Sequence, residues 1–153
     1  MNRLFAIAAV LVTVTVAWPS VATADQSPTD PAITSGKAAK DLSAARNKWL
    51  SSGISNYRFS IRASCFCAFI DPVTVKVRGK RKKVSNPDWF GPRSVPQLFK
   101  VVRGAIDRGA AVLTVKYDKA DGHPRSIAID YSLQIADEEI GYTVKGFEPL
   151  PVR

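Results

Sequence analysis

The stretch Asn56–Cys67 constrains the fold of this chain more than any other. Its apolar side chains Tyr57, Phe59 and Ile61 are separated by single polar residues. A period of two is typical of a β-strand with one face buried and the other in water. The sequence therefore predicts a sheet that must be covered by other elements on one side only.

Two amphipathic helices are predicted to supply that cover, one starting at Lys37 and the other at Ser94. Each has an apolar stripe at helical spacing, formed by Ala38, Leu42, Ala45 and Trp49 in the first helix and by Leu98, Phe99, Val102 and Ile106 in the second. Gly53 and Gly109 end them. Alternating stretches after each helix predict three strands, including the hairpin through Gly79-Lys80.

The predicted order is therefore α-β-β-β-α-β-β-β, in an α+β fold with two helices packed on one face of an antiparallel sheet. Residues 37–86 and 94–148 each contain one helix and three strands. We predict that these two halves form a pseudo-repeat.

The first 24 residues have the pattern of a signal peptide. A basic start is followed by the uncharged apolar run Leu4–Trp18 and by the small residues Ala22 and Ala24, so we predict cleavage before Asp25 and export to the periplasm or the extracellular space. An uncleaved anchor is the alternative, but the run is short of the roughly 20 residues that a membrane span needs. We expect no transmembrane span after cleavage. Residues 25–36 are predicted to be a flexible lead-in, and 37–150 a single domain.

The formal net charge of +9 indicates an anionic partner. Export makes nucleic acid an unexpected partner and leaves anionic lipid, cell-wall polymer or acidic protein. Polar positions of the strands place bases on the uncovered face of the sheet, extended by the basic hairpin. The candidate anion-binding residues are Arg58, Arg62, Lys76, Arg78, Lys80, Arg81, Lys82, Lys83, Lys116 and Lys145, with only Asp118 and Asp130 expected as acids on the same face. A purely solvated face is the alternative interpretation.

Cys65 and Cys67 are the two cysteines of the chain. An oxidising compartment favours a disulfide between them. Two residues of strand span about 6.6 Å, close to the limit of about 6.8 Å for the Cα separation in a disulfide, so the bond requires a kink. A redox-active pair and a soft-metal site are the alternatives. A redox pair usually lies at a helix N-terminus, whereas this pair ends a strand.

No pattern in the sequence indicates a specific reaction. His123 is the single histidine and lies in the turn Asp121–Pro124, where a solvated residue is expected. The acidic residues Asp130, Asp137, Glu138 and Glu139 lack the spacing of a calcium loop. We therefore predict a binding domain without catalytic residues, metal or cofactor. The alternative is a thiol-disulfide oxidoreductase or a soft-metal site that uses Cys65 and Cys67.

Several short motifs, in this order, resemble a family of exported bacterial proteins known as domain of unknown function 6174. They are Ala45-Arg46 with Trp49, Tyr57-Arg58-Phe59, Cys65-Phe66-Cys67, Leu98-Phe99, Val115-Lys116-Tyr117-Asp118, Gly122-His123-Pro124, Ile127-Ala128-Ile129-Asp130 and Asp137-Glu138-Glu139-Ile140. The resemblance covers roughly Leu42 to Phe147. Its members usually have proline after the second cysteine, where this chain has Ala68, which implies a less rigid loop. The resemblance supports the compartment and the domain extent, and it implies no activity.

Overall fold

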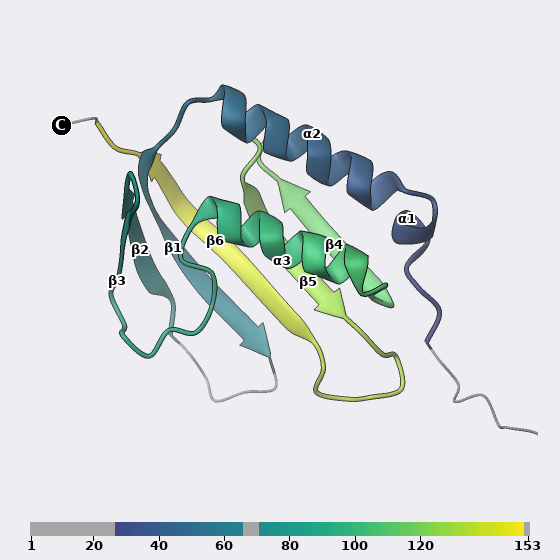
Figure 1. Cartoon of the computed structure of the whole chain (residues 1–153). Coiled ribbons are helices and arrows are strands. Elements are labelled where there is room, and N and C mark those ends of the chain that lie inside the picture. Colours follow the sequence, from purple (N-terminus) through teal and green to yellow (C-terminus); the bar gives the residue numbers. More distant parts are fainter. Residues whose placement is uncertain (1–26, 66–70, 152–153) are drawn as a thin grey trace, which may run out of the picture.

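The computed structural model describes residues 27–65 and 71–151 of the chain. The helices are α1 (Pro31–Thr34), α2 (Lys37–Ser51) and α3 (Val95–Asp107). The strands are β1 (Asn56–Cys65), β2 (Val73–Arg78), β3 (Arg81–Val84), β4 (Val112–Tyr117), β5 (Pro124–Asp130) and β6 (Ile140–Pro149). Apart from the short α1, this is the predicted order, and the α+β class is confirmed (Figure 1).

The strands form one antiparallel sheet with the order β3-β2-β1-β6-β5-β4. Each half of the chain contributes three neighbouring strands, and β1 pairs with β6 where the halves meet. The second half thus has the helix and three strands that a pseudo-repeat requires. That the two halves superpose remains a prediction.

Helices α2 and α3 lie over the same face of the sheet (Figure 1). From α2, Leu42, Ala45 and Trp49 are buried, and α3 contributes a longer buried stripe that includes Leu98 and Phe99. Burying each large apolar side chain stabilises the fold by about 1.5–3 kcal/mol. No helix in the described residues is long and apolar enough to cross a membrane.

Tyr57 connects these layers at one end of the core. Its ring lies edge-on to Trp49, with the ring centroids 5.3 Å apart, and its hydroxyl oxygen accepts a hydrogen bond of 3.1 Å from the backbone N–H of Val95. Burial raises the pKa of Tyr57 above its ordinary value, while this hydrogen bond acts in the opposite direction. One strand residue thus fixes both the end of α2 and the start of α3.

Helix α1 lies in the segment 25–36, for which the sequence predicts a flexible lead-in. The described part of that segment is attached to the second half of the chain through Asp30. The Asp30 carboxylate caps α1 by accepting from Ala32 N–H at 2.7 Å, and it also accepts from Leu113 N–H at 2.9 Å. The Asp30 N–H donates to the carbonyl oxygen of Ala110. A four-residue helix has too little periodicity to be recognised in a sequence.

Candidate anion-binding face

The outer face of the sheet, which points away from α2 and α3, has basic side chains on five strands, β3, β2, β1, β6 and β4. Residues directly opposite each other in an antiparallel sheet share a face. Lys76 lies opposite both Lys83 and Arg58, and Arg78 lies opposite Arg81. Adjacent strands are about 4.8 Å apart, so like charges are held close together here. None of the ion pairs among the described residues involves Lys76, Arg78, Arg81 or Lys83.

A hollow lies beside this array, over β1 and β6. Its lining includes the cations of Arg62 and Lys145 and the hydroxyl groups of Ser60 and Thr143, with Pro72 at its margin, and its volume is about 240 Å³. Arg62 is opposite Thr143, and Ser60 is opposite Lys145. Two cations and two hydroxyl donors around a small space can hold a carboxylate, sulfate or phosphate group.

Arg58 forms an ion pair with Glu148, an acid on this face that the sequence pattern does not predict. Its Nη2 atom lies 2.7 Å from the Glu148 carboxylate, on the opposite strand β6. The β1–β6 register shifts between Arg58 and Ser60, so Glu148 and Lys145 both reach the outer face although they are three residues apart. Gly146, with φ of 58°, lies within that shift. A bulge of this kind leaves no clear alternation in the sequence.

The basic hairpin does not lie on one face as a whole. Lys82 is opposite Val77, whose side chain is buried under the helices, so Lys82 belongs to the helix-covered side of β3. Lys80 lies in the turn between β2 and β3. Lys116, opposite Ser126, is on the outer face but on the edge strand β4, away from β2 and β3. The outer face therefore holds a compact basic group at β3-β2-β1 and a thinner extension across β6 to β4.

The acids expected among these bases lie at two other places. Asp130 is at the end of β5, opposite Val112, and Asp118 follows β4. Ala120 N–H donates to the Asp118 carboxylate at 2.8 Å and, as the largest cause, lowers the pKa of Asp118 below its ordinary value. Neither carboxylate forms an ion pair with the described outer-face bases.

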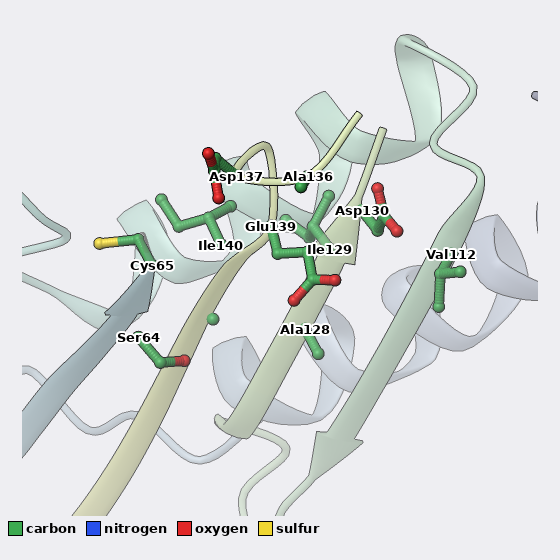
Figure 2. Close-up of a pocket in the computed structure, with 11 residues that line it drawn as sticks. Ser64, Cys65, Val112, Ala128, Ile129, Asp130, Ala136, Asp137, Glu139 and Ile140 are labelled. Atoms are coloured by element: carbon green, nitrogen blue, oxygen red, sulfur yellow. The ribbon is translucent and has the colours of Figure 1, made fainter. Parts of the chain in front are cut away.

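Asp130 lines a second, larger hollow of about 660 Å³ at the far end of the outer face. Figure 2 shows its side chains over the ends of β1, β6, β5 and β4. Its floor contains the small residues Ser64, Ala128 and Gly141, and Asp137 and Glu139 join Asp130 around it. A Cβ atom at Gly141 would collide with the Ser64 side chain, so glycine keeps this floor low. The outer face thus has a basic end and an acidic end.

His123 is buried, at 5% exposure, and is not the solvated turn residue that was expected. Its ring stacks on Phe147 with a centroid distance of 4.2 Å, and its Nδ1 atom lies 2.5 Å from the Asp121 carboxylate. Asp118, Asp121 and His123 bring three potential metal-ligating atoms within 4.8 Å of one another, and this is the one such group in the described residues. However, backbone N–H groups already occupy both carboxylates, and the cations of Arg125 and Lys145 line the same hollow. The arrangement fits a hydrogen-bonded turn better than a cation site.

Comparison with protein families gives one match, over residues 41–149, to a family of unknown function named DUF6174. The chain belongs to this family. No curated protein and no solved structure matches it. The DUF6174 match begins within α2 and ends at the last residue of β6, so it covers the whole sheet, α3 and most of α2. It confirms the resemblance seen in the sequence and assigns no activity.

Of the two cysteines of this DUF6174 protein, Cys65 is within the described residues. Cys65 is the last residue of β1 and is partly buried. It also lines the larger hollow, the one that contains Asp130, Asp137 and Glu139 (Figure 2). Cys67 lies outside the described residues. The predicted Cys65–Cys67 disulfide, and the redox and soft-metal alternatives to it, therefore remain predictions. The predicted signal peptide also lies outside the described residues.

Proposed function

We propose that this DUF6174 domain binds an anionic component of the cell envelope through the outer face of its sheet. The observation that carries the proposal is the hollow that Arg62 and Lys145 line together with Ser60 and Thr143. Such a hollow suits one anionic group of a ligand. The neighbouring bases would hold further anionic groups of the same molecule.

The cross-strand pairs of like charge support this proposal. Lys76 opposite Lys83 and Arg78 opposite Arg81 repel each other in the free protein. A bound anion would offset that repulsion. Relief of the repulsion between like charges in the free protein would therefore contribute to the free energy of binding. Lysines on an edge strand also discourage pairing with another sheet, but that role does not account for the bases on the inner strand β1.

A polymer with repeated anionic groups fits this face better than an isolated small anion. The bases cover four neighbouring strands, β3, β2, β1 and β6, at a strand spacing of about 4.8 Å. One small anion would occupy the hollow alone and leave the array on β2 and β3 unmatched. We therefore favour an anionic cell-wall polymer among the three partners expected from the sequence.

Export is part of the proposal, because it would bring the domain to such a polymer. The apolar run Leu4–Trp18 and the small residues before Asp25 are the supporting features. In that compartment we propose a Cys65–Cys67 disulfide that fixes the local shape of the chain after β1. Its short loop gives little loop entropy to global stability. Intact mass after alkylation without reductant checks it, and two alkylated thiols would contradict it.

The function is tested by retention of the purified protein on isolated anionic cell-wall polymer, with anionic vesicles as a second arm. The variant Arg62→Glu/Lys76→Glu/Lys145→Glu should lose most of its retention on the polymer. Wild-type retention should fall steeply between low and physiological salt, because exposed charges are screened over about 8 Å at physiological ionic strength.

A matched control separates the face from net charge alone. Lys40→Glu/Lys82→Glu/Lys119→Glu makes the same change in charge at exposed positions of α2, the helix-covered side of β3 and the turn after β4. This control should keep most of the retention. Equal retention of both variants would overturn the assignment to the outer face, and stronger retention on vesicles than on polymer would replace the polymer with a lipid surface.

A further inference from the structure

A groove between α2 and α3, on the opposite side of the molecule from the outer face, combines an apolar floor with a cationic rim. The two helices lie side by side and run in opposite directions (Figure 1). We infer that this groove binds a single-chain anionic amphiphile, with one anionic group and an unbranched apolar chain. This site is independent of the proposed function of the sheet.

The floor of the groove comes from the apolar stripes of both helices. Leu42 and Trp49 of α2 and Phe99 of α3 line it, and each is at most 6% exposed, so the floor is continuous with the core. Leu50 also lines the groove, but its side chain is 64% exposed, an unusual position for a large apolar residue on a helix that is otherwise polar outside. An apolar chain in the groove would cover Leu50 and rest on the ring of Trp49.

The rim carries only positive charge. Arg46 of α2 and Lys100 and Arg103 of α3 line the groove, and no carboxylate is among its described lining residues. Arg103 has an acid within 4.0 Å, Asp107, one turn further along α3, whereas Arg46 and Lys100 take part in none of the ion pairs between described residues. Charge complementarity therefore selects an anionic head group.

The size of the groove sets the size of the ligand. Its volume is about 320 Å³, at the low end of the roughly 300–1,000 Å³ that is typical of small-molecule sites. Apart from the cations, the polar side chains in the lining are those of Ser43 and Asn47, and the remaining lining side chains are apolar, so a ligand body away from the head group meets mainly apolar contacts. A medium-length alkyl carboxylate or alkyl phosphate fits these limits, and a polysaccharide or a peptide does not.

The test is a titration of the purified protein with decanoate, followed by NMR. Decyl phosphate, decyltrimethylammonium and decyl maltoside are titrated in parallel, all below their critical micelle concentrations. The two anions should give saturable shifts of the Trp49 indole N–H and of the backbone amides of Leu50 and Lys100. The cation should bind at least tenfold more weakly, and the neutral amphiphile should lie between. A carboxylate-only or phosphate-only response identifies the head group.

Two variants and a control decide whether the groove is the site. Arg46→Glu/Lys100→Glu should weaken decanoate binding at least tenfold, and Ser43→Trp, which fills the groove without changing its charge, should do the same. The control Lys40→Glu/Lys119→Glu should bind as the wild type does. Native spectra of each variant confirm folding.

Equal affinity for decanoate and decyltrimethylammonium, or unchanged affinity in both groove variants, would overturn the inference. The outer-face variant Arg62→Glu/Lys76→Glu/Lys145→Glu should bind decanoate normally, so the two sites can fail separately.

Discussion

Lys76 of β2 lies directly opposite Lys83 of β3 on the outer face of the sheet. Both side chains are exposed, and like charges in this relationship destabilise a sheet. The pair should therefore lower the free energy of unfolding of the free protein by a small, measurable amount. Substitutions at these two residues can then show opposite effects on stability and on binding.

Replacing Lys83 by glutamate should stabilise the fold, because the repulsive pair becomes an attractive one. Cross-strand pairs of this kind contribute about 0.2–1 kcal/mol, and the gain should shrink at high salt. Urea unfolding at low ionic strength gives the free energy. Lys82→Glu is the matched control, since Lys82 is opposite Val77 and gains no such partner. A variant no more stable than this control would contradict the cross-strand register, and the stabilised variant should bind the anionic polymer less well.

Much of this fold could be predicted, because one side of the sheet is buried and the other is wet. The alternation of Tyr57, Phe59 and Ile61 identifies the buried side of β1, and all three are in the core. The same alternation in Val73, Val75 and Val77 identifies it in β2. Local patterns suffice here, since each strand reports its own orientation.

The composition of the candidate site was harder to predict, because it depends on which strands pair and in what register. The approach of Glu148 to Arg58 requires β6 to lie beside β1 and a bulge between Arg58 and Ser60. Burial of His123 depends on Phe147, which is distant in sequence. The run of bases Lys80–Lys83 is continuous in the sequence, but side chains alternate along a strand, so Lys82 points to the opposite side of β3 from Arg81 and Lys83.

Gly122 should be far less tolerant of substitution than Gly79, although both have positive φ angles, of 83° and 55°. A Cβ atom at Gly122 would collide with the backbone carbonyl of Ala45 in α2, whereas nothing lies within 4 Å of a Cβ at Gly79. Gly79→Ala should cost only the left-handed strain, about 1–2 kcal/mol. Gly122→Ala should lower the free energy of unfolding clearly more than Gly79→Ala does. Equal costs would show that the turn after β4 does not pack against α2.

Stability should fall at alkaline pH, partly through Tyr117. Burial raises the pKa of Tyr117, and the Asp41 carboxylate adds to that effect. The native state therefore keeps this proton above pH 10, where the unfolded chain releases it. The stabilisation is complete below about pH 10 and is lost as the pH rises further. Between pH 8 and pH 11, Tyr117→Phe should lose less stability than the wild type, by on the order of 1 kcal/mol. An identical loss would contradict the burial of the phenol.

The most direct test of the central claim is to map by NMR where a soluble fragment of anionic cell-wall polymer binds. We predict salt-sensitive shifts at Ser60, Arg62, Thr143 and Lys145 that extend to Lys76 and Lys83, and no shifts with a neutral polymer of equal length. Shifts confined to α2 and α3, or shifts that persist unchanged at high salt, would contradict the claim that the outer face of the sheet binds an anionic partner.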